Sequence, residues 1–383
     1  MGVFVQSLKL NNFRSYASLR ITLDTRVEPI ILTGPNGAGK TNILEALSFL
    51  APGRGLRRAA LSEVGRIGAP SQWAVAATIN NGNGTGSMDV GTGLAPMSAD
   101  QQGNNKRLVR VDGNYVAGPA AFADIWSVSW LTPQMDRLFL EGPSSRRRFL
   151  DRLMLGLYPD HARQVSAYER AMRERNRLLS MTDRPTDPAW LSALEGRMAA
   201  HGIAVAASRI EFAELLLGQI EKAPEGPFPK ASLTLDGSVE QALLTSPATQ
   251  VEEMMKEQLK HNRKRDAQNG RTNEGPHKCD LKITHKAKNM PAEQCSTGEQ
   301  KALMIGLILA NAHLTKLTTG AAPLMLLDEV VAHLDNERRL GLFDALLNLE
   351  SQCWLTGTDR ALFEGLTGRA KFFEVADSKV YTA

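Results

Sequence analysis

The stretch Ile30-Ile31-Leu32-Thr33-Gly34-Pro35-Asn36-Gly37-Ala38-Gly39-Lys40-Thr41 decides the fold class of this chain. From Gly34 it matches the pattern G-x-x-x-x-G-K-[ST] in full, between an apolar run and an apolar-periodic run, which is typical of a strand, a loop and a helix. Glycines let such a loop wind its backbone N–H groups around phosphate oxygens, and the N-terminus of the following helix faces the same anion. The stretch therefore predicts an α/β protein with a phosphate-binding loop, in which Lys40 meets the β- and γ-phosphates and the Thr41 hydroxyl binds Mg²⁺. The residues of the predicted loop are Gly34, Pro35, Asn36, Gly37, Ala38, Gly39, Lys40 and Thr41.

A second apolar run, Leu324 to Leu327, ends in the two carboxylates Asp328 and Glu329. An uninterrupted apolar run of this length is typical of a buried parallel strand. At its carboxyl end, Asp328 is predicted to hold Mg²⁺ through water, beside the phosphate loop. Glu329 is predicted to be the base that orients or deprotonates the attacking water. An ordinary strand end with exposed acids is the alternative, and the presence of the phosphate loop argues against it.

The segment from Cys295 to Lys301 precedes a long apolar helix predicted over 303–317. Ser296 and Glu299 fit the capping box Ser-x-x-Glu at the start of that helix. Gly298 lies in the first turn, where glycine costs about 1 kcal/mol relative to alanine. This glycine makes sense if a ligand must approach the helix N-terminus closely, and an anion is the natural candidate.

The bulk composition limits the class of protein. The chain has 383 residues, enough for about two or three domains, and a formal net charge of only +4, so any nucleic-acid contact must come from local clusters. Its three cysteines form no CxxC pair, which argues against a disulfide framework or a zinc site and predicts a cytoplasmic protein. The alternating start does not resemble a signal peptide, and the longest apolar run, 303–310, is too short to span a bilayer.

Alternating residues over 3–10 and 19–24 predict a β-hairpin before the phosphate loop. This order favours a mixed sheet with an antiparallel layer. Further strands are predicted over 73–79 and 107–111, and the Gly- and Asn-rich segment 80–93 is predicted to be a turn or loop.

A helical insertion is predicted from about residue 143 to 220, with a Pro-rich break at 184–188 between two long helices, and a basic amphipathic helix is predicted over 252–264. Basic clusters in this region are candidates for DNA phosphate contact, although each alone could be a solvated helix face. The role of Arg54, Arg57 and Arg58 stays open between a solvated loop and phosphate contact. The DNA-binding candidates are Arg146, Arg147, Arg148, Arg152, Arg173, Lys260, Arg263 and Lys264.

Taken together, these segments resemble the ABC-type ATPases. The stretches that resemble the Walker A, signature, Walker B and D-loop motifs are 34–41, 296–301, 326–329 and 333–335. The segment Asn12-Phe13-Arg14-Ser15-Tyr16 resembles the branch that contains the SMC proteins, and the segments 142–151 and 275–278 resemble the RecF family of bacterial recombination mediators. The resemblance implies an ABC-type ATPase head, built from a mixed β-sheet with a P-loop core and an antiparallel β subdomain, plus a helical arm or lid. The implied domains are the first part of the head (1–140), the arm (141–270) and the second part of the head (271–383).

The same resemblance implies a homodimer that forms on ATP and Mg²⁺. Ser296, with Gly298 behind it, would meet the γ-phosphate held by the other protomer, Arg14 would reach the phosphates in cis, and Asp335 would work across the interface. The implied partners are gapped DNA with single-strand/double-strand junctions, RecR- and RecO-type mediators, and a RecA filament loaded at stalled forks during SOS induction. ATP hydrolysis is expected to be weak and DNA-dependent, and to time DNA release.

Some positions depart from the pattern of ABC-type ATPases. Cys295 and Thr297 replace the usual leucine and glycine, and Thr356 follows the strand where transporters have the switch histidine. Gln134 lies near the expected Q-loop position, and its role stays open. Two alternatives also remain at this stage: an energy-coupling subunit of a transporter, and a non-hydrolysing, ATP-gated DNA-binding module in which Glu329 does little.

Overall fold

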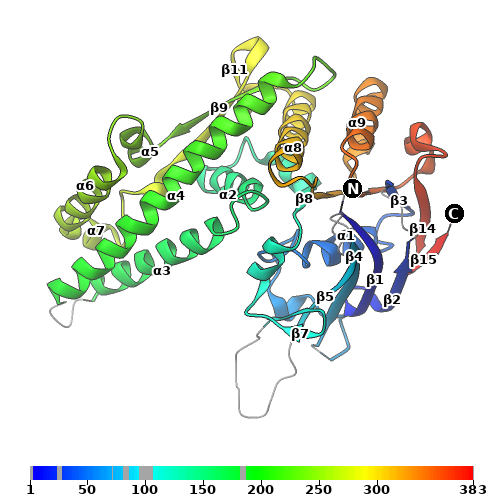
Figure 1. Cartoon of the computed structure of the whole chain (residues 1–383), viewed down its shortest axis with the longest axis horizontal. Coiled ribbons are helices and arrows are strands. Elements are labelled where there is room, and N and C mark those ends of the chain that lie inside the picture. The colour runs from blue at the N-terminus through cyan, green and yellow to red at the C-terminus, as the bar shows by residue number, and fades with distance from the viewer. Residues whose placement is uncertain are drawn as a thin grey trace. The chain divides into compact units, whose positions relative to one another are not determined.

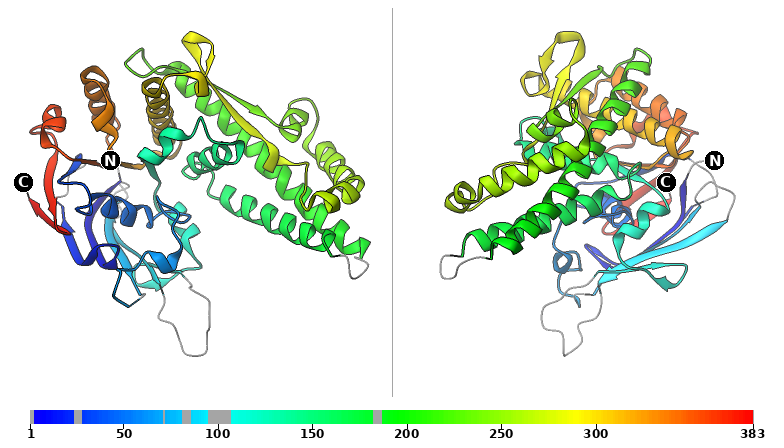
Figure 2. Two further views of the ribbon diagram at one scale, coloured as in Figure 1. Left: turned by 180° about the vertical axis from the view of Figure 1, so that it is seen from behind. Right: turned by 60° about the vertical axis from the view of Figure 1, so that its left-hand side comes forward.

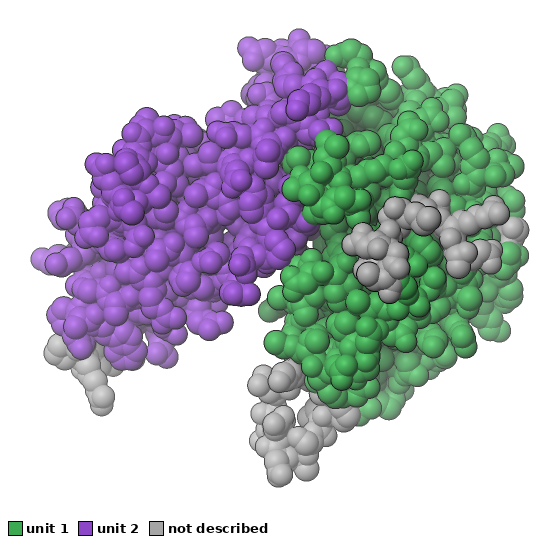
Figure 3. Space-filling model, viewed as in Figure 1, with its two compact units in different colours: residues 1–136, 224–228, 297–383 green, residues 137–223, 229–296 purple. Residues whose placement is uncertain are grey.

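The structure is a computed structural model, and it describes residues 3–23, 28–70, 72–80, 86–94, 107–181 and 187–382. The chain divides into two compact units, coloured separately in Figure 3. The first comprises residues 1–136, 224–228 and 297–383, and the second comprises residues 137–223 and 229–296. The helical unit therefore continues to residue 296, beyond the boundary of 270 expected from the sequence, because a strand after residue 279 pairs with the strand that follows its longest helix.

The first unit is built around a mixed sheet with strand order β15-β14-β3-β13-β12-β8. All neighbours in it are parallel except β15, which pairs with β14 in the antiparallel direction. The strands β3, β12 and β13 are buried along their whole length, which confirms the buried parallel strand predicted at 324–327. The strands are β3 (Ile30–Thr33), β8 (Val128–Leu131), β12 (Leu324–Leu327), β13 (Cys353–Gly357), β14 (Lys371–Ala376) and β15 (Lys379–Thr382).

A second sheet in this unit is antiparallel and has the order β2-β1-β4-β5-β6-β7. It contains the predicted N-terminal hairpin, so the mixed architecture with an antiparallel layer is confirmed. Helix α1 (Lys40–Ser48) contacts strands of both sheets, whereas α8 (Thr297–Thr319) and α9 (Asn336–Asn348) lie on the other face of the mixed sheet (Figure 1). The strands are β1 (Phe4–Phe13), β2 (Tyr16–Thr22), β4 (Ala74–Asn80), β5 (Ser87–Leu94), β6 (Arg107–Val111) and β7 (Asn114–Tyr115).

Strand β5 corrects the prediction that 80–93 is a turn or loop; residues 81–85 of that segment lie outside the described residues. One of the glycines that suggested a loop, Gly93, is required by close packing within the sheet. A Cβ at Gly93 would lie 2.5 Å from the carbonyl oxygen of Trp73. Val90, Thr92 and Leu94 are buried in alternation, as in a strand with one face on the core.

The second unit contains a long antiparallel helical hairpin formed by α3 (His161–Leu179) and α4 (Pro188–Lys222), visible in both views of Figure 2. Side chains join the two helices in antiparallel register, with Gln164 bonded to His201 and Arg175 to Glu195. The two long helices are therefore confirmed; of the Pro-rich break, residues 182–186 lie outside the described part of the chain. Packed with the hairpin are α2 (Pro143–Met154), α5 (Ser238–Leu243), α6 (Ala248–His261), α7 (Arg263–Asn269) and a sheet of β9 (Ala231–Asp236), β10 (Asp280–His285) and β11 (Met290–Pro291).

Two sequence predictions about helices need adjustment. The basic helix predicted over 252–264 is two helices, because α6 ends at His261 and α7 begins at Arg263. Helix α8 is longer than the apolar run seen in the sequence, and among the described residues it is the one helix long and apolar enough to cross a bilayer. Most of its apolar window is buried within the protein, as in the core helix of a folded domain.

Candidate nucleotide-binding site

The predicted phosphate loop connects β3 to α1 and is shaped by glycines. Gly34 has a φ of +144°, and a Cβ there would lie 2.1 Å from the carbonyl oxygen of Val375 on β14. Gly39 has a φ of +112°, and a Cβ there would lie 2.6 Å from the hydroxyl oxygen of Tyr16. A side chain at either position would push the loop away from the strands that support it, so both glycines are needed for the path of the loop.

Lys40 lies inside this loop. Its Nζ donates hydrogen bonds to the carbonyl oxygens of Gly34 (2.6 Å) and Pro35 (2.9 Å), and the residue is buried. Burial lowers the pKa of Lys40, while the nearby carboxylates of Glu329 and Asp328 act in the opposite direction. The ammonium group is therefore placed between the phosphate loop and the two carboxylates at the end of β12.

Asp328 follows β12 and connects three strand ends. Its Oδ1 accepts hydrogen bonds from the hydroxyls of Thr41 (2.9 Å) and Thr356 (2.8 Å), and its N–H donates to the carbonyl oxygen of Leu131 after β8 (2.9 Å). Burial raises the pKa of Asp328, and the two hydroxyl donors partly offset that effect. The carboxyl ends of parallel strands meet here, which is where open α/β sheets bind ligands.

The residues at this edge fit a magnesium ion shared with a nucleotide. Thr41 and Asp328 offer two hard oxygen ligands that already lie within 2.9 Å of each other. Within the described ranges there is no group of three His, Cys, Asp or Glu residues able to hold a metal alone. Mg²⁺ in nucleotide sites takes one or two protein ligands and completes its shell with phosphate oxygens and water.

Glu329, the predicted base, has a left-handed backbone conformation with a φ of +51°. Its N–H donates a hydrogen bond to the hydroxyl oxygen of Thr356 (2.9 Å), which in turn donates to Asp328. Thr356 thus forms hydrogen bonds with both the carboxylate predicted to bind Mg²⁺ and the backbone of the predicted base. From the sequence it was noted only as a departure from the switch histidine. Its place at the end of an apolar strand was the signal for this role, because such strand ends gather at one edge.

Replacing Thr356 with Val tests this role, because valine keeps the shape and removes the hydroxyl. Asp328 would lose a donor and the Glu329 N–H its acceptor, a loss of about 1–3 kcal/mol. We expect ATP turnover (kcat) to fall about tenfold or more and KM for ATP to change much less, with activity restored in Thr356→Ser. Steady-state phosphate release over a range of MgATP concentrations measures both constants. Wild-type turnover in Thr356→Val, or equal losses in the Ser and Val variants, would contradict this role.

Two further residues, Lys301 and Gln134, lie near the edge of the mixed sheet where its parallel strands end. Lys301 on α8 is buried, its Nζ lies 3.8 Å from Asp136 Oδ2, and burial lowers its pKa while Asp136 and Glu329 act to raise it. Gln134 lies in the short 3-10 helix Pro133–Arg137 after β8, the strand that pairs with β12. This location agrees with a Q-loop position, and the assignment of Gln134 stays a prediction.

The Arg14 side chain is held by hydrogen bonds to residues outside the phosphate loop. Its guanidinium forms a bidentate ion pair with Glu45 on α1 (Nε–Oε2 2.8 Å, Nη2–Oε1 2.5 Å) and donates to the carbonyl oxygen of Glu63. Arg57 donates to the same Glu45 carboxylate (3.0 Å) and to Asn42. These bonds hold the Arg14 guanidinium at Glu45 and Glu63, and its contact with nucleotide phosphates stays a prediction.

The predicted signature and D-loop residues lie at helix starts. Ser296 directly precedes α8, and Asp335 caps α9 by accepting from the N–H of Arg338 (2.8 Å). At Gly298 the nearest atom to an added Cβ would be Arg338 Nη1 at 3.7 Å, an ordinary contact distance. The chain's own packing therefore does not require glycine at this position, and the close approach of an outside ligand there stays a prediction.

Of the eight predicted DNA-binding cations, one is buried, three are half-buried and four are exposed. Arg146 is buried and forms a bidentate ion pair with Asp280 (2.7 and 2.8 Å), so it is a structural residue, which corrects its prediction as a DNA contact. Arg147 donates to the Cys279 carbonyl oxygen, and Arg263 pairs with the buried Glu195. Arg152 is half-buried beside the ring of Phe149. The exposed candidates are Arg148, Arg173, Lys260 and Lys264.

The two segments that carry the narrower family resemblance meet in the second unit, where α2 contacts the 3-10 helix Pro276–Lys278. Besides the Arg146–Asp280 pair, Arg209 on α4 donates to the carbonyl oxygen of Pro276 (2.8 Å) and Tyr168 on α3 is bonded to His277 Nδ1 (2.6 Å). Burial lowers the pKa of His277 to about 4, so this histidine is neutral at physiological pH. These motifs therefore hold the base of the helical hairpin together.

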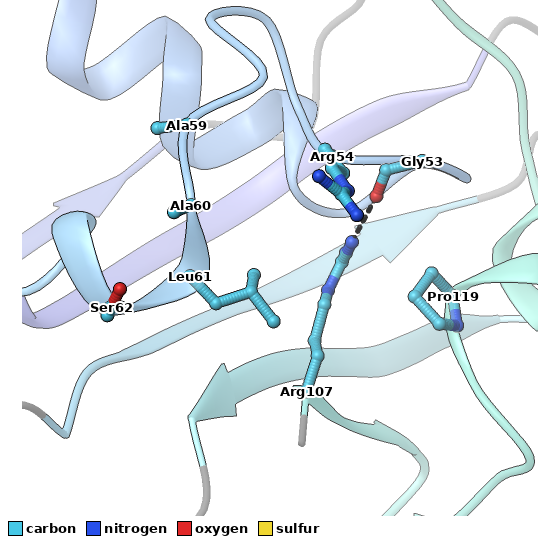
Figure 4. A pocket seen from close by; sticks show the side chains of 8 residues that line it. All are labelled: Gly53, Arg54, Ala59, Ala60, Leu61, Ser62, Arg107 and Pro119. Atoms are coloured by element: carbon cyan, nitrogen blue, oxygen red, sulfur yellow. Dashed lines mark hydrogen bonds between the residues drawn. The ribbon is translucent and has the colours of Figure 1, made fainter. Parts of the chain in front are cut away.

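A pocket of about 420 Å³ in the first unit is separate from the motifs above (Figure 4). Arg107 on its wall donates to the carbonyl oxygens of Phe49 and Gly53 and, through Nε, to Thr92 Oγ1 (2.9 Å). Arg54 also lines it and is exposed. The lining holds no carboxylate, histidine or cysteine, so the groups suited to phosphate chemistry are those at the phosphate loop.

The chain is similar to known proteins over nearly its full length. A profile described as "RecF/RecN/SMC N terminal domain" matches residues 4–379. The chain is 48% identical over 379 residues to the "DNA replication and repair protein RecF" of Rhizobium meliloti (strain 1021), covering 99% of this chain and 98% of the relative. It is 47% identical over 375 residues to the protein of the same name from Brucella suis biovar 1, covering 98% and 95%.

Solved structures show the same fold. A structure of "the recombination mediator protein RecF-ATPrS in RecFOR pathway" aligns with a TM-score of 0.85 at 20% identity, covering 100% of this chain and 98% of that one. An Smc head domain from Pyrococcus furiosus aligns with a TM-score of 0.54 at 16% identity, covering 100% and 96%. The predicted fold, an ABC-type ATPase head with a helical insertion, is confirmed.

Proposed function

Since the chain belongs to the RecF family, we propose that it is an ATP-dependent DNA-binding recombination mediator that dimerises on ATP and acts in DNA repair and replication. The observation that carries this proposal is the hydrogen-bonded chain from Thr41 through Asp328 and Thr356 to the backbone of Glu329. These hydrogen bonds connect the phosphate loop to the carboxylate pair Asp328 and Glu329. A site that binds and hydrolyses a nucleoside triphosphate requires both parts.

In this proposal each residue has one task. The loop amides and Lys40 hold the β- and γ-phosphates, and Lys40 exchanges its bonds to Gly34 and Pro35 for phosphate oxygens. Thr41 and Asp328 hold Mg²⁺, which neutralises charge on the phosphates when bound. Glu329 orients the attacking water and accepts its proton.

The dimer is supported by the open helix start at Gly298. Ser296 and Gly298 would contact the γ-phosphate bound by the partner protomer, with Asp335 at the interface. This explains a first-turn glycine that the chain's own packing leaves unexplained. Each bound nucleotide is then contacted by the phosphate loop of one protomer and by Ser296 and Gly298 of the other.

DNA is the proposed polyanion, and gapped DNA with strand junctions the proposed substrate. The exposed cations of the second unit, including Arg148, Arg173, Lys260 and Lys264, would contact phosphates without reading sequence.

RecO and RecR are the proposed partners, because a similar solved protein is described in the RecFOR pathway. The proposed function also includes loading of RecA at stalled forks and support of the SOS response. ATP hydrolysis is proposed to be slow and DNA-dependent, and the protein is proposed to be cytoplasmic. The family match over residues 4–379 argues against the transporter alternative.

Fluorescence anisotropy with labelled gapped, duplex and single-stranded DNA tests the proposal, with and without MgATP over a salt series. We expect MgATP to tighten binding to gapped DNA and affinity to fall steeply with salt. Binding that is indifferent to MgATP, or absent on all three substrates, would refute it. Sedimentation of the protein with MgATP tests the dimer in parallel.

Replacing Lys40 with Met removes the charge proposed for the phosphates while keeping the length of the side chain. Charge-assisted hydrogen bonds contribute about 1.5–3 kcal/mol each, so we expect affinity for ATP to fall by about tenfold or more. ATP-dependent dimerisation should be lost at ATP concentrations that saturate the wild type. Isothermal titration measures the first effect and sedimentation the second; the variant Lys9→Met, at an exposed position on β1, serves as control. A dimer that still forms on ATP would contradict the role of Lys40.

A further inference from the structure

One tryptophan of this protein differs from the others in its exposure. The chain contains five, and Trp73, Trp126, Trp130 and Trp354 are at most 6% exposed. Trp190 is 52% exposed. It lies in the first turn of α4, at the end of the helical hairpin where α3 finishes, and nothing in the nucleotide site uses it. An exposed indole ring offers a flat apolar surface for a ligand.

Exposed arginines lie on both helices of the hairpin that carries Trp190. On α3, Arg163, Arg170 and Arg177 recur every seven residues, so they share one side of the helix, and all three are exposed. On α4, Arg197 follows Trp190 by seven residues and is exposed on the same side. Arg173 is also exposed, which gives five arginines on these faces against three acidic residues. The acidic residues are Asp160, Glu169 and Glu174. Asp160 pairs with Arg163, and Glu169 pairs with Arg173.

The other side of the hairpin end is also basic. Arg263, the first residue of α7, donates to Ser192 Oγ (2.8 Å) and to the carbonyl oxygen of Pro188 (3.4 Å), which places the start of α7 beside the first turn of α4. Lys264 follows it and is exposed. Asp187, next to these groups, uses its carboxylate to accept from the N–H of Ala189 as the helix cap.

We propose that Trp190 is a stacking platform for unpaired bases of single-stranded DNA, whose phosphates are held by the arginines of α3 and α4. Sites for single strands combine aromatic rings with cations that follow the backbone. In a duplex the base faces are already stacked, so this ring distinguishes a single strand from a duplex. Seven residues of helix span about 10.5 Å, so the arginine row covers about 21 Å, the length of several nucleotides. The proposal deepens the function proposed above, because it assigns the single-stranded side of a junction to the hairpin end.

Intrinsic fluorescence gives a direct test, because the other four tryptophans are buried. We expect oligo(dT) to quench the emission in a saturable way and a duplex of the same length to leave it unchanged. A stacked base contributes about 1–3 kcal/mol, so Trp190→Ala should weaken binding to oligo(dT) about fivefold or more. Trp190→Phe should lose the quenching and keep most of the affinity. Duplex binding, ATP turnover and dimerisation should stay at wild-type values in both variants.

The matched control is Met181→Ala, which removes a side chain just after α3 that is 54% exposed but not aromatic. It should bind oligo(dT) like the wild type. The inference is overturned if Trp190→Ala binds oligo(dT) normally, or if the quenching persists in Trp190→Phe. Failure of the wild type to bind DNA of any form would instead refute the proposed function. Circular dichroism of each variant verifies that the hairpin is folded.

Discussion

Replacing Glu329 with Gln is expected to lower ATP turnover by about 10²–10⁴-fold while ATP binding is retained. The amide has the size of the carboxylate but cannot accept a proton from the attacking water. The hydrogen bond that holds this residue runs from its backbone N–H to Thr356, so the substitution leaves it in place. Lys40 and the phosphate loop are also unchanged, so the variant should bind ATP and remain a dimer.

Phosphate release under single-turnover conditions measures the chemical step, and sedimentation with MgATP measures the dimer. The control is Glu364→Gln, an exposed acid in the 3-10 helix Arg360–Leu366, which should leave both quantities unchanged. If turnover is equal in the wild type and Glu329→Gln, the base lies elsewhere. If the wild type dimerises without measurable turnover, the alternative of a non-hydrolysing, ATP-gated module is correct.

The nucleotide site could be predicted because its constraints are local. The phosphate loop needs glycine, lysine and threonine at fixed spacing, and the second carboxylate motif follows an unmistakably apolar strand. Thr356 has no such local pattern. It reaches the site because β13 lies between β3 and β12 in the sheet, and strand order is set by packing across the whole unit. The hydrogen bonds that give Thr356 its role therefore became visible only in the structure.

Charge patterns were less informative than apolar ones. Arg146, Arg173 and Arg175 look alike in a list of basic residues, yet Arg173 is exposed and the other two are buried. The distinguishing signal is helical spacing. Arg175 has Ala171 four residues before it and Leu178 three after, which places it on the buried side of α3. Exposed Arg173 lies outside that apolar row, so the periodicity separates ion pairs inside the protein from surface cations.

Arg175 also gives the largest expected effect on stability. It is fully buried, and it donates to Glu195 on α4 (3.0 Å), Asp266 on α7 (2.8 Å), Thr272 (3.0 Å) and the carbonyl oxygen of Leu259 on α6 (2.6 Å). One guanidinium thus ties α3 to three other helices of the second unit. Replacing it with Met keeps most of the volume but leaves the carboxylate of Asp266 buried without its cation. Removing one partner of a buried ion pair costs about 3–5 kcal/mol, and we expect the free energy of unfolding of the second unit to fall by that amount.

The measurement is urea denaturation followed by circular dichroism, with Arg177→Met as the control. Arg177 lies on the exposed side of the same helix, so its loss should change the free energy of unfolding by less than about 0.5 kcal/mol. Adding Asp266→Asn to Arg175→Met should recover part of the stability, because the stranded charge is then removed. A loss below about 1 kcal/mol in Arg175→Met would show that water or rearranged neighbours satisfy the two acids. ATP binding by the phosphate loop, which lies in the first unit, should survive in folded Arg175→Met and so separate the stability of the hairpin from the chemistry of the head.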